Sequence, residues 1–238
     1  MPRTAVVCEP GSVVTPLPNS PRPAAEPSVL PPDTASAQPT TPRGRRTRNA
    51  LVHAAREVFE EQGFHSTKIA DIPRRAAMSH GSFYTYFDSK HAIFREVVNA
   101  AMGDLFQATR SGLGDGGSPV ERIRAANTRY FASYARNAGV LRAIEEASFR
   151  DPYFHDLLAQ IRAVFVDRIT TGIRRLQEQG LADPKLDAER AAASLGGMAE
   201  QAARHAFLFG DSFVDELTVD TLTRLWARGI GLDPDSRD

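Results

Sequence analysis

Residues 79–90 read SHGSFYTYFDSK, a short stretch with an unusual density of aromatic rings. Four rings fall within five positions: Phe83, Tyr84, Tyr86 and Phe87. Small and hydroxylated residues are interleaved with them: Ser79, Gly81, Ser82 and Thr85. Whichever face of the segment points outward is therefore small, hydroxylated and flat, and we interpret that face as a contact surface.

The composition of the whole chain narrows the kind of protein that carries this surface. With 238 residues, 42% hydrophobic residues and zero formal net charge, the chain is expected to form a globular protein of one large or two small domains. The charge is unevenly distributed. Residues 43–95 contain ten Lys or Arg against five Asp or Glu, an excess of five positive charges (10 − 5) around the aromatic stretch.

Several classes of function are excluded by what the sequence lacks. Cys8 is the single cysteine, which excludes disulfide frameworks and cysteine-based metal sites and favours the reducing cytoplasm. No apolar run is long enough to cross a membrane. The sequence has no phosphate-binding glycine loop, no nucleophile elbow and no His or carboxylate pair at metal spacing. We therefore expect neither enzymatic activity nor a cofactor.

The first 42 residues differ in composition from the rest. They contain 11 of the 16 prolines and show no helical or strand periodicity, so we predict a disordered tail. Two interpretations stay open: a start codon assigned upstream of the true one, or a flexible arm. The cluster RGRRTR at residues 43–48, with Arg45 and Arg46, is where such an arm would contact phosphates.

Helical periodicity begins at Thr47 and predicts a first amphipathic helix that ends at Gly63. Its apolar stripe comprises Leu51, Ala54, Ala55, Val58 and Phe59. A second helix is expected from Ser66 or Thr67 to about Arg75. Pro73 inside it would cost about 3 kcal/mol, unless the helix starts later, with Asp71 as its cap and the proline in its first turn. After a turn at residues 76–78, a third helix capped by Ser79 is expected to reach Tyr86. Two short helices packed on a longer one are the layout of a helix-turn-helix unit.

At this point the sequence resembles the TetR-type transcriptional regulators. The residues that carry the resemblance are Ala54, Ala55, Phe59, Gly63, Phe64, Thr67, Ile69, Ile72, Ser79, Gly81, Ser82, Phe83, Tyr84, Tyr86, Phe87, Ser89 and Lys90. They span about 45 residues, and their spacing is specific. Beyond Lys90 the resemblance is only to the helical plan of the family.

The resemblance implies a DNA interface centred on the third helix. Phe83 and Phe87, four residues apart, should anchor the helix on the first one. The residues expected at the DNA are then of three kinds: His80, Gly81 and Thr85 at the bases; Tyr84, Tyr86, Thr67 and Lys90 at phosphates; and Ser79, Ser82, Arg45 and Arg46 on the same surface. Lys90 opens the next helix, where free amides also attract a phosphate.

The rest of the chain is expected to be helical, which makes the fold class all-α. Ser89 should cap a helix to about Gly112, and Ser118, Pro119 and Glu121 form a capping box. That helix is expected to end at residues 137–139, before a short helix to Arg150. Further helices are expected at 152–180, from Asp187 to Phe209, and at 215–229. We predict a DNA-binding domain at 43–91 and a ligand-binding and dimerisation domain at 92–232.

Two sites are candidates in the second domain. An apolar cavity for a small molecule could use Asn127, Tyr130, Phe131, Tyr134, Phe149, Tyr153, Phe165, Arg168 and Phe207, although ordinary core is the commoner role for each aromatic residue among them. By resemblance to the family, the last two helices form a four-helix interface in a homodimer, with Gly197, Gln201, His205, Leu222 and Trp226.

The function that these features predict is a cytoplasmic, nucleoid-associated regulator of transcription. It would bind a palindromic double-stranded operator as a homodimer, most often as a repressor in this family, and release it when a small apolar or amphipathic effector binds. The alternative is a constitutive DNA-binding or architectural protein whose helical domain only dimerises.

Overall fold

A computed structural model of the chain describes residues 39–110, 117–208 and 215–233. Across these residues the secondary structure consists of eight α-helices without a β-strand, which confirms the all-α prediction. The helices are α1 (Pro42–Ser66), α2 (Asp71–Arg75), α3 (His80–Tyr84), α4 (Lys90–Arg110), α5 (Pro119–Ser148), α6 (Pro152–Glu178), α7 (Ala188–Leu208) and α8 (Glu216–Gly229). Residues 1–38, for which a disordered tail was predicted, lie outside the described part.

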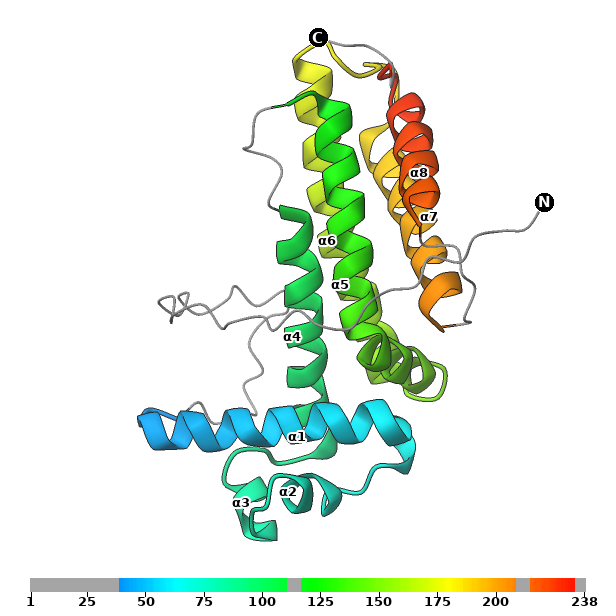
Figure 1. The fold of residues 1–238 in the computed structure, drawn as a ribbon. Coiled ribbons are helices and arrows are strands. Elements are labelled where there is room, and N and C mark those ends of the chain that lie inside the picture. Colours follow the sequence, from blue (N-terminus) through cyan, green and yellow to red (C-terminus); the bar gives the residue numbers. More distant parts are fainter. Residues whose placement is uncertain (1–38, 111–116, 209–214, 234–238) are drawn as a thin grey trace, which may run out of the picture.

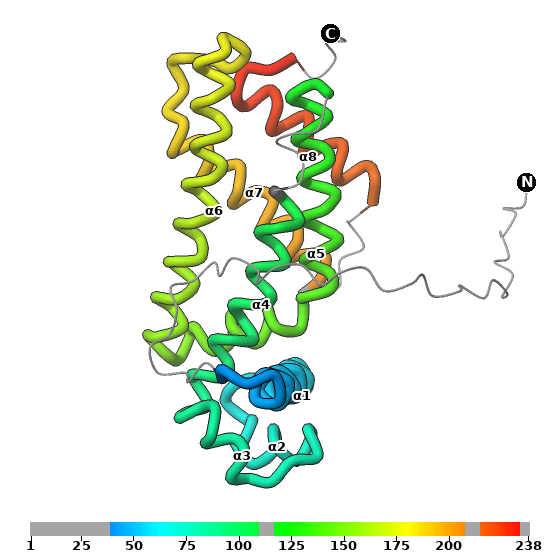
Figure 2. Tube along the Cα trace, turned by 90° about the vertical axis from the view of Figure 1, so that its left-hand side faces the viewer, coloured from blue at the N-terminus to red at the C-terminus, as the bar shows by residue number. Residues whose placement is uncertain are grey.

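The helices form a small unit below a long bundle. In Figure 1, α1 lies across the lower end of α4, with α2 and α3 beneath it, while α4 to α8 rise above it. The view turned by 90° in Figure 2 shows α1 nearly end-on between α2 and α3 below and the bundle above. This arrangement confirms an N-terminal three-helix unit that carries a helix-turn-helix and a C-terminal helical domain.

Helix α1 starts earlier than the sequence indicated. The Thr41 side chain caps it by accepting a hydrogen bond from the Gly44 amide at 3.1 Å. The cluster RGRRTR is therefore part of a helix rather than of an extended arm. Gly63 interrupts the helix as predicted, with φ 73° and ψ 171°, before a last turn to Ser66. The apolar stripe predicted for this helix is buried throughout.

Helix α2 starts late, as the second of the two predictions required, but Asp71 is its first residue and not its cap. It begins at Asp71, so Pro73 is its third residue. An amide at this position has no partner within a helix, and the proline therefore removes no helical hydrogen bond. The expected penalty does not arise. The strained position is instead Ala77 in the following turn, where φ is 53°.

Helix α3 is two residues shorter than predicted. It ends at Tyr84, and the amides of Tyr86 and Phe87 both donate to the Phe83 carbonyl at 3.0 Å. Ser79 precedes the first residue as expected, although its side chain makes no capping bond to the backbone. Its hydroxyl instead lies 2.9 Å from that of Ser82.

The caps predicted for the C-terminal helices are present. Each of these side chains accepts a hydrogen bond from an amide two or three residues ahead: Ser89 from Ala92, Ser118 from Glu121, Asp151 from Tyr153, Asp187 from Arg190 and Asp215 from Thr218. Local signals of this kind are sufficient to place helix starts.

One predicted helix end in this domain is wrong. Helix α5 continues through Asn137 and Gly139 to Ser148. The buried amide of Asn137 donates to the Ser133 carbonyl one turn earlier, at 2.9 Å. Gly139 is needed because α1 crosses here: a Cβ at this position would lie 2.7 Å from Cγ of Glu60. Gly139, which the sequence suggested as a helix end, instead allows α1 and α5 to approach each other closely.

The core is continuous from the three-helix unit into the bundle. Phe64 of α1 lies 5.0 Å from Phe94 of α4 and 4.6 Å from Phe154 of α6, measured between ring centroids, and all three rings are buried. The predicted boundary between residues 91 and 92 thus falls inside a shared core. A second cluster, which includes Ile173, Ala192 and Ile230, joins α6, α7 and the end of α8.

Candidate nucleic-acid interface

Helix α3 is fixed by its apolar side. Phe83 and Phe87 are 0% and 1% exposed, which confirms that they face inward, and their ring centroids are 5.9 Å apart. Ile72 of α2 is buried in the same cluster. Because these rings hold the helix on the core, its opposite side is presented to solvent.

That opposite side carries the residues expected at the bases. His80, Gly81 and Thr85 are exposed, and so is Tyr84, at 54%. The rings of His80 and Tyr84 lie 5.5 Å apart, one helical turn from each other. A helix of five residues is about 7.5 Å long, short enough for a major groove about 12 Å wide. Tyr86, also expected at a phosphate, is half-buried.

Within the described residues, no contact and no backbone angle requires a glycine at position 81. A Cβ at this position would meet no atom within 4 Å, and its backbone does not adopt a positive φ. Glycine in a helix costs free energy relative to alanine. The position is therefore open to close approach by a molecule outside the chain.

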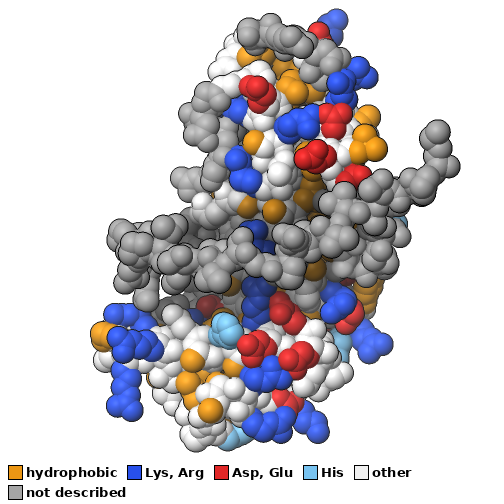
Figure 3. Space-filling view, in the orientation of Figure 1, with side chains coloured by type: hydrophobic (Ala, Val, Ile, Leu, Met, Phe, Trp, Pro, Cys, Tyr) orange, Lys and Arg blue, Asp and Glu red, His pale blue; other side chains and the backbone are white. Residues whose placement is uncertain are grey.

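Basic side chains lie at the amino-terminal end of α1. Arg43, Arg45 and Arg46 are exposed, and on the face seen in Figure 3 Lys and Arg gather at this end. Arg45 donates to the Thr40 carbonyl at 2.7 Å. Arg48 differs from them, because it is 7% exposed and pairs with Glu96 at 2.8 Å.

Arg48 is a structural residue that the sequence analysis missed. Its guanidinium lies over the Phe87 ring, 4.9 Å from the centroid. Together with the ion pair to Glu96, this contact joins α1 to α4 and to the segment that follows α3. The signal that could have identified it is its spacing: it precedes the apolar Leu51 by three residues, on the buried stripe of α1.

Two of the predicted phosphate contacts are not supported by their positions. The ammonium of Lys90 donates to the main-chain carbonyls of Phe64 and Thr67, at 2.8 and 2.9 Å, and to that of His65 at 3.4 Å. These three bonds occupy the three donors of a lysine. Thr67 is 2% exposed, and its hydroxyl donates to the Gly63 carbonyl at 2.7 Å. Both side chains close the carboxyl end of α1 instead.

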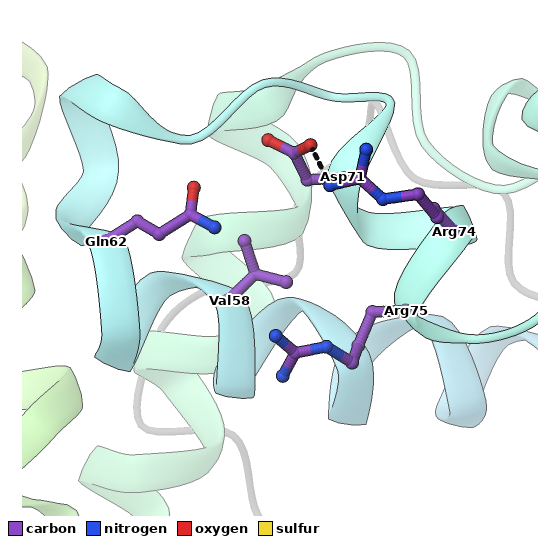
Figure 4. A pocket seen from close by; sticks show the side chains of 5 residues that line it. All are labelled: Val58, Gln62, Asp71, Arg74 and Arg75. Carbon is purple, nitrogen blue, oxygen red and sulfur yellow. Dashed lines mark hydrogen bonds and ion pairs between the residues drawn. The ribbon is translucent and has the colours of Figure 1, made fainter.

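An ion-pair clamp fixes α2 against α1. Arg75 donates to both carboxylate oxygens of Glu61, at 2.9 and 2.6 Å, and to Glu57 at 3.2 Å. The hydrogen bond from Arg75 lowers the pKa of the Glu61 carboxyl. Figure 4 shows Arg75 beside the pair of Asp71 and Arg74, on the wall of a shallow cavity of about 300 Å³ between the two helices. The clamp orients the helix-turn-helix from outside the core.

The candidate pocket residues of the second domain are only partly brought together. Tyr130, Phe131, Tyr134 and Phe207 form one aromatic cluster between α5 and α7, with Tyr134 stacked on Phe207 at 5.8 Å. Burial raises the pKa of both tyrosine hydroxyls. Phe165 packs elsewhere, against Phe106 of α4 at 5.6 Å.

Phe149 and Tyr153 do not line an internal cavity. They are 80% and 37% exposed, at the turn between α5 and α6, and the Tyr153 hydroxyl accepts from Arg95 at 3.1 Å. A residue so close to a helix end can continue the apolar stripe of its helix and still lie beyond the neighbouring helices that cover the rest of that stripe.

The two polar candidates have partners within the protein. Asn127 is buried and donates to the Thr223 hydroxyl of α8 at 3.3 Å. Arg168 donates to the Phe106 carbonyl at 2.7 Å and to the Thr109 hydroxyl, and its guanidinium lies over the Phe106 ring. Arg129 of α5 also donates to the end of α4, to the Ala108 carbonyl at 2.9 Å. Arg168 and Arg129 therefore cap the carboxyl end of α4.

The residues predicted for the dimer interface fall into two groups. Gly197, Gln201 and His205 are exposed along one side of α7 at intervals of four residues. Leu222 is 6% exposed and belongs to the interior of the subunit, whereas Trp226 is half-buried and packs against the second core cluster. The exposed apolar residues of α8 are instead Leu217, at 69%, and Leu225, at 51%.

The described residues offer little support for other kinds of site. They contain no group of three His, Cys, Asp or Glu placed to hold a metal ion. Within the same residues, no helix has both the length and the apolar character that a membrane span needs. A buried anchor, an exposed reading face and a short turn between α2 and α3 define a helix-turn-helix DNA-binding protein.

Comparison with known proteins identifies the family. Residues 51–97 match the family described as bacterial regulatory proteins, tetR family, and residues 123–231 match the C-terminal domain of the transcriptional regulator EthR. The chain belongs to the TetR family of transcriptional regulators.

Individual relatives agree with this assignment. The HTH-type transcriptional regulator EthR of Mycolicibacterium smegmatis is 26% identical over 211 residues, which cover 83% of this chain and 95% of the relative. The HTH-type transcriptional repressor KstR2 of Rhodococcus jostii is 31% identical over 134 residues, which cover 56% of this chain and 61% of the relative.

Solved structures show the same fold at low sequence identity. The fatty acid degradation regulator FadR from Bacillus halodurans superposes with a TM-score of 0.66 at 16% identity, covering 79% of this chain and 96% of that one. GusR of Salmonella enterica gives a TM-score of 0.67 at 21% identity, covering 78% and 95%.

Proposed function

We propose that this regulator is a repressor that binds a palindromic operator as a homodimer and releases it when a small apolar or amphipathic effector binds in the helical domain. Its place of action is the nucleoid in the cytoplasm. The observation that carries the DNA-binding part is the exposed face of α3, where Gly81 is open to an outside partner while Phe83 and Phe87 anchor the helix.

The proposed contacts follow from exposure. His80, Gly81 and Thr85 would meet base edges, and Tyr84 would place its hydroxyl on a phosphate. Arg45 and Arg46 would add phosphate contacts from the end of α1. Ser79 and Ser82 lie on the same exposed turn and share a hydrogen bond, which leaves lone pairs on both oxygens.

The proposed dimer surface combines the exposed stripes of α7 and α8. No atom of the described residues lies within 4 Å of where a Cβ of Gly197 would be, so that part of the subunit leaves this position open for a close approach. Leu217 and Leu225 supply exposed apolar area on α8. A symmetric interface of this kind would set the distance between the two helix-turn-helix units of the dimer, and that distance would set the spacing of the operator half-sites.

The effector response would depend on α4. Its first residue, Lys90, is bonded to the end of α1, and its last turn is held by Arg129 and Arg168 from α5 and α6. An effector among the aromatic side chains would act by favouring one position of α4, because a ligand with equal affinity for both states shifts nothing.

Selection of bound sequences from random duplex DNA tests the operator and the dimer together. We expect an inverted repeat and a complex with two subunits. Leu225→Arg should yield a monomer in sedimentation and weaken operator binding, while Leu181→Arg, at a comparably exposed leucine outside α7 and α8, should do neither. An unrepeated site, or a dimeric Leu225→Arg protein with normal binding, would contradict the proposal.

A second candidate function is a constitutive DNA-binding protein without an effector. The observation that favours it is the packing of the aromatic cluster, where Phe131 and Tyr134 are buried and in contact with their neighbours. The two candidates differ in one measurement. A fatty acid or acyl thioester series that leaves operator affinity unchanged at every chain length would favour the constitutive protein.

A further inference from the structure

A groove of about 350 Å³ lies where the DNA-binding unit meets the bundle. One wall is residues 62–66 at the end of α1, and the other comprises Glu146, Phe149 and Arg150 at the end of α5. In Figure 1 these two helix ends meet at the right-hand side of α1. Its volume is at the lower end of the range for small-molecule sites, about 300–1,000 Å³.

The groove lies next to a tight crossing of the two helices. Gly139 of α5 is in close contact with Glu60 of α1, and Arg56 donates to the Arg136 carbonyl at 2.8 Å. Beyond this crossing, Gly63 interrupts α1 and α5 ends at Ser148. The wall that α1 contributes therefore includes backbone at a helix break.

Two opposite charges line the groove without pairing. Glu146 and Arg150 are four residues apart, and glutamate on the amino-terminal side is the favourable order for an ion pair in a helix. Among the described residues, however, neither makes a hydrogen bond or an ion pair with the other or with a third side chain. One carboxylate oxygen of Glu146 instead lies toward the opposite wall, 3.4 Å from where a Cβ of Gly63 would lie.

An exposed ring belongs to the same wall. Phe149 is 80% exposed, the highest value among the large apolar side chains of the described residues that lie exposed. A single exposed aromatic residue needs no explanation. A ring on the wall of a cavity beside an unpaired acid and an unpaired base offers apolar contact together with two charge-specific contacts.

We propose that this groove binds a small zwitterion of the α-amino-acid type with an apolar side chain. Its ammonium would bind Glu146, its carboxylate would bind Arg150, and its side chain would pack on Phe149. The groove is separate from the aromatic cluster between α5 and α7. A ligand in the groove would contact both α1 and α5, and it would therefore fix the three-helix unit (α1 to α3) relative to the bundle.

Calorimetric titration of the full chain with three related compounds tests this site. L-Phenylalanine carries both charges, phenethylamine only the ammonium and phenylacetate only the carboxylate. We expect L-phenylalanine to bind most tightly. Glu146→Gln should weaken phenylalanine and phenethylamine by about fivefold, the worth of an exposed ion pair, without affecting phenylacetate. Arg150→Gln should weaken phenylalanine and phenylacetate without affecting phenethylamine.

Matched controls come from the far end of the bundle. Glu178→Gln and Arg174→Gln change exposed residues near the end of α6 and should leave all three affinities unchanged. Phe149→Ser should weaken all three compounds. Absence of saturable phenylalanine binding, or equal losses in the groove and control variants, would overturn the site. The titration contains no DNA, so its outcome is independent of whether the chain represses transcription.

Discussion

Replacing Gly81 with alanine should separate stability from DNA binding. The new methyl group meets no atom within 4 Å, so the subunit accepts it without rearrangement. Glycine in a helix costs about 0.5–1 kcal/mol relative to alanine, and a position near a helix end lies at the lower bound. We therefore expect stability to rise by about 0.5 kcal/mol, which corresponds to about 1–2 °C in Tm for a chain of this length.

The same methyl group should reduce operator affinity. If the backbone of α3 lies against the bases, the added methyl overpacks the interface at about 1–3 kcal/mol, and a homodimer presents it twice. The expected loss is about 2–6 kcal/mol, at least about 30-fold in Kd. Fluorescence anisotropy with a selected operator measures the affinity, and thermal unfolding measures the stability.

Gly172→Ala provides the matched control. Gly172 lies on α6 and also has no atom within 4 Å of a would-be Cβ, so alanine should stabilise the protein without a change in operator binding. A Gly81→Ala protein that binds the operator as tightly as the unmodified chain would refute the argument that an outside partner approaches this residue.

Three further substitutions test the local structure. Lys90→Met should destabilise the protein by about 2 kcal/mol in urea unfolding, because it leaves carbonyls at the end of α1 without their charged donor; an unchanged midpoint would argue against this role. Ala77→Gly should stabilise by about 0.5–1 kcal/mol, since it relieves a left-handed backbone conformation, and a loss of stability would contradict the strain. The hydrogen bond from His91 lowers the pKa of Asp151 in the folded protein. The ionised carboxylate therefore stabilises the fold at any pH above the ordinary carboxyl pKa of about 3.9. This stabilisation is lost as the pH falls from that value through the lower pKa of the folded protein. Asp151→Asn should therefore be less stable than the unmodified chain at pH 6, and thermal unfolding between pH 6 and 3 should show the difference shrink below about pH 4; a difference that is constant with pH would count against the pair.

The sequence alone determined the features that depend on near neighbours along the chain. The starts of α4, α5 and α8 follow from Ser89, Ser118 and Asp215, whose side chains bond to amides three residues ahead. The burial of Phe83 and Phe87 follows from their helical spacing. These interactions span at most one helical turn, so the residue types at fixed intervals are enough to predict them.

Tertiary structure alone decided the features that depend on partners far apart in the chain. Lys90 binds carbonyls up to 26 residues away, which changes its expected role from a phosphate contact to a helix cap. Gly139 resembles a helix stop until α1 is seen to cross it at Glu60. Leu222 and Leu225 are alike in sequence, yet only the second is exposed. The physical reason is the same in each case: the direction in which α1, α4 and α8 pack determines which side chains are covered, and local periodicity does not contain that direction.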